Sequence, residues 1–149
     1  MLELKFGFIK EKQMLAPKRQ KYRKIFRGKN RGIAVRGSQI AFGEYALKAL
    51  VNGKISSAQI EAARKAIAHF TKREGKIWIR VFPARPITAK AAGVRMGGGK
   101  GDIQGYVANI VPGKILFELA GVNEAVAIDA FKRAADKISV KTKFFKKEI

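Results

Sequence analysis

The feature that most restricts the fold of this chain is the distribution of its charges. Between Lys12 and Gly43 there is no acidic residue, but there are ten basic ones: Lys12, Lys18, Arg19, Lys21, Arg23, Lys24, Arg27, Lys29, Arg31 and Arg36. A second acid-free stretch runs from Gly75 to Gly101. Like charges at this density repel one another in a compact state unless a polyanion neutralises them. We therefore expect both stretches to lie at the surface and to face a nucleic acid.

The first stretch contains a basic arm, residues 17–36, which begins PKRQKYRKIFRGKNRG. Tyr22 and Phe26 are interleaved with cations, and their spacing fits neither a helix nor a strand. The arm is therefore predicted to be extended and to fold against its partner. A solvated tail or a localisation signal is the alternative, but the interleaved aromatic residues favour ordered contact.

The rest of the composition is that of a folded protein. The chain has 149 residues, of which 47% are hydrophobic, so it is long enough for one domain with a core. The net charge of +21 and the pI near 10.6 favour nucleic acid as the partner. An anionic membrane surface is the rival, but residues 27–43 lack the broad apolar helix face that it requires.

Several other classes are excluded by what the sequence lacks. Without cysteine there is no disulfide framework, thiolate metal site or cysteine nucleophile. No apolar run approaches the roughly 18 residues that span a bilayer, and the N-terminus does not resemble a signal or transit peptide. We expect a soluble intracellular protein.

One helix is predicted with particular clarity, from Ser56 to Gly75. Ser56 and Gln59 have the spacing of a capping box at its N-terminus. The buried face is formed by Ile60, Ala63, Ile67 and Phe70. Arg64 lies on the flank of this apolar stripe, where a ligand can reach it. A second helix is expected from a cap at Asn123 to Lys137, with its buried side formed by Ala127, Phe131, Ala134 and Ile138.

Strands are predicted around and between these helices. Short strands broken at Gly37 and Gly43 are expected in residues 33–50, a turn in 52–54, and a strand in 76–82 that Pro83 and Pro86 end. Two strands are expected on either side of Pro112 and Gly113, as a hairpin, and a last strand in 140–145. The predicted fold class is α+β, a mixed or antiparallel sheet with two main helices packed on it, plus the arm and a long glycine-rich loop.

The glycine-rich loop reads GVRMGGGKG, residues 93–101. It is not a P-loop, because Lys100 is followed by Gly101 and Val94 stands where the first glycine is needed. The dinucleotide fingerprint fails as well, because Asp102 occupies its third glycine position. We interpret the loop as a flexible probe in which Arg95 and Lys100 meet phosphate or a base edge, Met96 adds an apolar contact and the glycines permit close approach. An ordinary mobile surface loop is the alternative.

No catalytic site is predicted. The single histidine, His69, lies away from the apolar helix face without a carboxylate or metal-ligand cluster, so it is interpreted as a surface residue rather than a general base. Trp78 and Phe82 are either core residues or a platform on which bases stack. A free-standing nucleic-acid regulator and a nucleotide-dependent enzyme acting on RNA remain as rival hypotheses, although no recognition helix, P-loop or acid cluster supports them.

Several segments together resemble the bacterial-type large-subunit ribosomal protein sixteen family. They are PKRQKYRK, RGKNRG, QIEAARKAI, GKIWIRVFP, VRMGGGKG, PGKILFE and the closing GV.E.A..AF..AA.K...KT.F. The resemblance runs from about Met14 to Phe145, with the motifs in the same order. It implies residues 14–149 as one RNA-binding domain, with the arm at 17–36 and a globular part at 37–149.

The resemblance implies a non-enzymatic constituent of the large ribosomal subunit, without cofactor or metal, in the cytoplasm of a bacterium or in an organellar ribosome. Its partners would be large-subunit rRNA, tRNA in the aminoacyl site and neighbouring ribosomal proteins. The rRNA contacts are expected from Lys18, Arg19, Lys21, Arg23, Lys24, Arg27, Lys29, Arg31, Arg36, Arg64 and Arg80. The loop facing tRNA and the peptidyl-transferase region would be Arg95, Met96, Gly97, Gly98, Gly99 and Lys100.

Two departures from the family pattern stand out. Gly98 occupies a position where the family commonly has lysine, so one phosphate contact is missing or comes from elsewhere. Residues 1–13 precede Met14, which resembles the usual start, and form an N-terminal extension. This extension is either an added rRNA-contacting segment or the product of an upstream start that is not used in the cell.

Overall fold

A computed structural model describes residues 15–148; the predicted extension, residues 1–13, lies outside the described residues. Within that range the chain forms strands and helices in the order β1 (Tyr45–Ala49), β2 (Gly53–Ser56), α1 (Ser57–Phe70), β3 (Lys76–Ile79), β4 (Arg85–Ala89), β5 (Asp102–Ile110), β6 (Ile115–Ala120), α2 (Glu124–Ala135) and β7 (Thr142–Lys146). Residues 15–44 contain no helix or strand.

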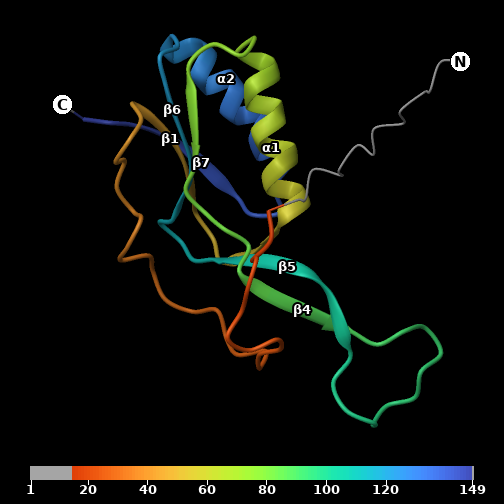
Figure 1. Ribbon diagram of the computed structural model, residues 1–149. Helices are drawn as coiled ribbons and strands as arrows, with labels where there is room; N and C mark the ends of the chain where they lie inside the picture. The colour runs from red at the N-terminus through yellow and green to blue at the C-terminus, as the bar shows by residue number, and fades with distance from the viewer. Residues whose placement is uncertain (1–14, 149) are drawn as a thin grey trace, which may run out of the picture.

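The strands form two sheets, in the orders β3-β6-β1-β7 and β2-β5-β4, and every pair is antiparallel. The α+β class of the predicted fold is confirmed, since two helices pack on antiparallel sheets. Figure 1 shows α1 and α2 side by side on one side of the four-stranded sheet, while the orange stretch that leads into β1 runs along the other side.

Helix α1 begins as its sequence predicts. The Ser56 side chain accepts from the Gln59 N–H, and the Gln59 side chain accepts from the Ser56 N–H, which completes the capping box. The helix ends at Phe70 rather than at Gly75, because Lys72 and Arg73 adopt positive φ values of 52° and 67° that a helix cannot continue. Helix α2 follows Asn123 and buries Ala127, Phe131 and Ala134, with Ile138 partly buried beside them.

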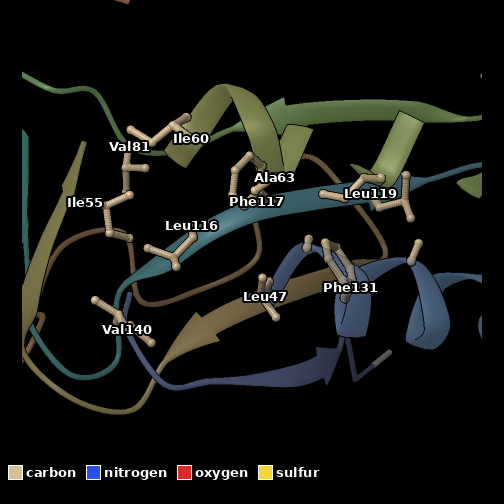
Figure 2. Packing of buried hydrophobic residues seen from close by; sticks show 14 of the residues in the cluster. Leu47, Ile55, Ile60, Ala63, Val81, Leu116, Phe117, Leu119, Phe131 and Val140 are labelled. Carbon is tan, nitrogen blue, oxygen red and sulfur yellow. The ribbon is translucent and has the colours of Figure 1, made fainter. Parts of the chain in front are cut away.

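One hydrophobic cluster joins both helices and both sheets. In Figure 2, Ile60 and Ala63 of α1 face Phe117 and Leu119 of β6, and Phe131 of α2 lies beside them. Ile55, Ala108 and Ile110 bring the three-stranded sheet into the same cluster. Burial of each large aliphatic or aromatic side chain contributes about 1.5–3 kcal/mol, so this shared core fixes the two sheets relative to each other.

Several predicted strands and turns are wrong. The expected hairpin at Pro112 and Gly113 does not form, because β5 pairs with β2 and β4 whereas β6 pairs with β1 and β3. The predicted turn at 52–54 falls largely within β2, and the strand expected in 76–82 stops at Ile79. Within 33–50 only Tyr45–Ala49 is a strand.

Pro86 does not end a strand but lies inside β4, where it pairs with Tyr106. This is possible because β4 is the edge strand of its sheet, where one side of the strand needs no ladder hydrogen bonds. The β4–β5 pair extends away from the helices, and Figure 1 shows the glycine-rich loop at its tip. The fold thus places this loop at the far end of the β4–β5 pair, away from both helices.

Candidate nucleic-acid interface

The basic arm is held against the globular part by side chains that bind backbone carbonyls. Gln20 donates to the carbonyl of Ala84 at 2.9 Å. Arg85 Nη2 donates to the carbonyl of Phe26 at 2.6 Å and also to that of Arg27. These bonds fix the path of the backbone without using the cations of the arm. Those at Lys18, Arg19, Lys21, Arg23, Arg27, Lys29, Arg31 and Arg36 are exposed.

Asn30 attaches the middle of the arm to the three-stranded sheet. Its Nδ2 donates to the carbonyls of Ile110, at 2.7 Å, and Gly53, at 3.1 Å. Asn52 Nδ2 in turn donates to the Asn30 carbonyl at 3.0 Å. A single amide therefore joins the arm to β2 and β5 at once.

The arm also touches the base of the glycine-rich loop. Lys24 Nζ donates to the Lys100 carbonyl at 3.1 Å and lies 3.8 Å from the Asp102 carboxylate, while Lys100 Nζ donates to the Ile25 carbonyl. The two lysines thus bind across the junction in both directions. Lys100, predicted as a tRNA-facing residue, lies at this junction, whereas Arg95 and Met96 are exposed farther along the loop.

The glycines of the loop suit a surface that approaches a partner closely. Gly97, Gly98 and Gly99 have φ values of 99°, 72° and 95°, and a Cβ built on any of them would meet nothing within 4 Å. Such backbone conformations are costly for other residues but not for glycine. Lys90, the residue that follows β4, donates from Nζ to the Gly97 carbonyl and so braces this run. The three glycines therefore leave bare backbone open to the outside.

A buried carboxylate anchors the segment between the arm and β1. Glu118 on β6 has no exposed surface and accepts from the N–H groups of Ala41, Phe42 and Gly43 at 3.2, 2.7 and 2.7 Å, and from Arg80. Burial alone raises the pKa of Glu118, but these hydrogen bonds outweigh it and the pKa lies below its ordinary value. The carboxylate is therefore ionised at neutral pH.

Two of the predicted rRNA-binding residues bind acids of this chain. Arg80 pairs with Glu118, and its guanidinium lies 5.1 Å from the centre of the Phe42 ring. Arg64 binds both oxygens of Glu61, at 2.9 and 2.6 Å, and this hydrogen bonding raises the pKa of Arg64. Their part in RNA binding remains a prediction, and much of their charge is already neutralised.

Trp78, expected as a core residue or as part of a stacking platform, lies against Phe42, the ring that Arg80 also faces. Trp78 stacks on Phe42 with ring centres 6.1 Å apart, and Lys76 Nζ lies 5.3 Å from the Trp78 ring. Phe42 and Phe82 are both exposed and Trp78 is half-buried. Sequence reasoning missed Phe42, although it lies in the acid-free first stretch. His69 is exposed on α1, as expected.

Sequence reasoning also missed four cations of the globular part that face the arm or brace the loop: Lys54, Arg85, Lys90 and Lys114. Arg85 and Lys90 fall in the second acid-free stretch, so a signal was present. Lys54 and Lys114 show no such signal in the sequence, since each is simply a lysine that follows a glycine.

Other kinds of site find no support in the described part of the chain. Residues 15–148 hold no group of three or more histidine, cysteine or acidic side chains that could bind a metal ion. Among the same residues, neither helix is long and apolar enough to cross a membrane.

Comparison with known families decides what kind of protein this is. The model of the family described as Ribosomal protein L16p/L10e matches residues 17–145, from the start of the arm to the last strand. The chain belongs to the L16p/L10e family of ribosomal proteins. The resemblance seen in the sequence is confirmed.

Membership gives the chain its general role. It is a structural constituent of the ribosome, associated with ribosomal RNA and proteins, and it acts in translation. Proteins of this family are generally structural rather than enzymatic. The family is found across the domains of life, so membership does not by itself assign a bacterial host.

Proposed function

We propose that this chain binds large-subunit rRNA through its basic arm and extends its glycine-rich loop toward tRNA in the aminoacyl site and the peptidyl-transferase region, in a bacterial ribosome. The observation that carries the proposal is the pairing of an arm of exposed cations with a separate exposed loop of glycines and Arg95. The two surfaces differ in chemistry. The arm suits permanent neutralisation by a phosphate backbone, whereas the loop suits a close and reversible contact.

Support for a shared RNA environment comes from the junction of Lys24, Lys100 and Asp102. Because the arm contacts the C-terminal end of the loop, an RNA that fixes the arm also restricts the position of that end. The loop can then point toward a second RNA even though it has no helix or strand of its own. Arg95 supplies a planar donor for phosphate or a guanine edge.

Binding to rRNA is tested by its dependence on salt. With six to ten phosphate contacts, affinity for isolated large-subunit rRNA should fall by about 10³–10⁵ between about 50 and 200 mM salt. In cell extracts the chain should sediment with the large ribosomal subunit. A flat salt response would count against rRNA binding. A sequence-preferring complex with DNA or messenger RNA away from ribosomes would favour a free-standing regulator.

The loop is tested by Arg95→Ala, with Lys65→Ala on the exposed face of α1 as the matched loss of charge. Arg95→Ala should leave folding and subunit incorporation unchanged and weaken tRNA binding to the aminoacyl site. Lys100→Ala is less informative, because Lys100 also binds the arm. Equal effects of Arg95→Ala and Lys65→Ala on tRNA binding would contradict the loop's role.

A further inference from the structure

A cleft of about 410 Å³ lies between the arm and the three-stranded sheet. Ile25, Phe26 and Arg27 line it from the arm, and Lys54, Arg85 and Ile87 from the sheet. Lys54 and Arg85 lie on the same face of the sheet: Lys54 pairs with Asn109 and Arg85 pairs with Val107, two residues apart on β5. The fold thus brings together cations that are far apart in the sequence.

The lining of this cleft is positively charged and has no counter-charge of its own. Arg27, Lys54, Arg85 and Lys100 all line it, and no aspartate or glutamate is among the lining residues. Arg85 and Lys100 donate to carbonyls of the arm, which are neutral. Cations that line one cleft repel one another, and an anion placed among them offsets the repulsion.

Donors remain available for such an anion. The bonds of Arg85 use Nη2, and within residues 15–148 neither Nη1 nor Nε of Arg85, nor Nζ of Lys54, has a protein acceptor. Guanidinium and ammonium groups together suit the oxygens of a phosphate. The volume is that of a site for a ligand the size of a nucleotide.

An apolar surface lies beside these donors. Phe26 is 93% exposed and Ile87 is 42% exposed, and both line the cleft. An exposed aromatic ring next to phosphate donors offers a stacking face to the base that follows the phosphate. A ring so exposed contributes little to the core, so its contact with a partner accounts for its position better than packing does.

We propose that this cleft binds one phosphodiester group of RNA, held by Lys54 and Arg85, with the adjoining base against Phe26. The proposal rests on the RNA-binding function proposed above and assigns to it a site outside the arm and the loop. An occupied cleft would join the arm to β2 and β4 through the RNA itself. The arm would then be fixed from both sides, by Asn30 and by the bound phosphate.

The test compares Lys54→Gln with Lys65→Gln in the full chain. The two variants lose the same charge, one in the cleft and one on the exposed face of α1. Binding to isolated large-subunit rRNA is measured over a range of salt concentrations. Lys54→Gln should reduce the slope of log affinity against log salt by about 1, and Lys65→Gln should leave it unchanged. Equal slopes for the two variants would overturn the cleft site while leaving RNA binding intact, whereas a flat slope for the unmodified chain would overturn the proposed function itself.

Two further measurements identify the ligand. Phe26→Ala should weaken binding about tenfold at every salt concentration with no change of slope, because stacking is uncharged; unchanged affinity would remove the base from the proposal. Adenosine monophosphate at millimolar concentration should not displace the RNA. If it did so in the unmodified chain but not in Lys54→Gln, the cleft would be a site for a free nucleotide and the assignment to RNA would be wrong.

Discussion

Arg80 forms an ion pair with Glu118 in which the carboxylate is fully buried and the guanidinium side chain keeps 19% exposure. The pair joins β6 to the residue that follows β3, and the same carboxylate receives three N–H groups from residues 41–43. A cation that the resemblance assigns to RNA therefore also stabilises the segment between the arm and β1. The Arg80–Glu118 pair thus stabilises the fold, whatever part Arg80 has in the proposed RNA binding.

Glu118→Ala should reduce the free energy of unfolding by about 3 kcal/mol. The substitution leaves Arg80 partly buried without its carboxylate, and leaves three N–H groups, of which that of Gly43 is buried, without their acceptor. Urea denaturation followed by circular dichroism measures the change. Glu124→Ala, which removes an exposed ion pair with Lys146, is the control and should cost much less, because solvent screens that pair. Similar losses for the two variants would contradict a stabilising role for the Glu118 cluster.

The contribution of Glu118 should also depend on pH. Because the folded-state pKa of Glu118 lies below its ordinary value of 4.5, the folded state favours the ionised carboxylate. The stabilisation is complete above the unfolded pKa and is lost as the pH falls through the folded pKa. The difference in unfolding free energy between the unmodified chain and Glu118→Gln should therefore be constant above about pH 5 and shrink at lower pH. A difference that grows on acidification would mean that folding does not favour the ionised Glu118 carboxylate, and would contradict this prediction.

Ser56→Ala should lower the free energy of unfolding by about 1 kcal/mol, because the first turn of α1 loses the hydroxyl that accepts from Gln59. Ser57→Ala changes the same residue type one position later, where no capping bond exists, and serves as the control. Thermal or urea unfolding measures both. If Ser57→Ala were the more destabilising change, the cap would not lie at Ser56.

Local patterns in the sequence predicted the parts of the fold that local interactions determine. The capping box and the spacing of Ile60, Ala63 and Ile67 give α1. The alternation in residues 140–145 gives β7, which starts two residues later and ends one residue later than predicted. Strand pairing was not predictable in the same way. Ile110 and Ile115 both read as strand residues beside a turn, yet they enter different sheets, because the shared core rather than the connection decides their partners.

The candidate interface was predictable in charge but not in geometry. The exposed cations of the arm follow directly from its acid-free sequence. The attachment of the arm to the globular part does not follow from the sequence. Arg85, Lys24 and Asn30 make this attachment by donating to backbone carbonyls, which every residue has, so no sequence motif marks them. For the same reason the cleft at Lys54 has no signature in the sequence.

Gly101→Ala should destabilise the β4–β5 pair, because a Cβ there would lie 2.5 Å from backbone atoms of Ala89. Backbone atoms cannot move away as the end of a flexible side chain can, so we expect the free energy of unfolding to fall by about 1–3 kcal/mol. Gly105→Ala, on β5 with nothing within 4 Å of its Cβ, is the control and should be neutral or slightly stabilising. Hydrogen exchange of the β4 and β5 amides measures both, and equal protection in the two variants would contradict the close approach.

Asn30→Asp should release the middle of the arm while leaving the core folded. The aspartate has the same shape but no Nδ2, so it cannot donate to the carbonyls of Ile110 and Gly53 and places a charge against them. Limited digestion with trypsin in the absence of RNA should then cut the arm, at sites between Lys18 and Arg31, several times faster. Gln39→Glu makes the same chemical change at an exposed side chain with no such bonds, so its digestion should match that of the unmodified chain. Equal digestion of Asn30→Asp and Gln39→Glu would mean that Asn30 does not hold the arm, and that its order depends on other contacts or on RNA alone.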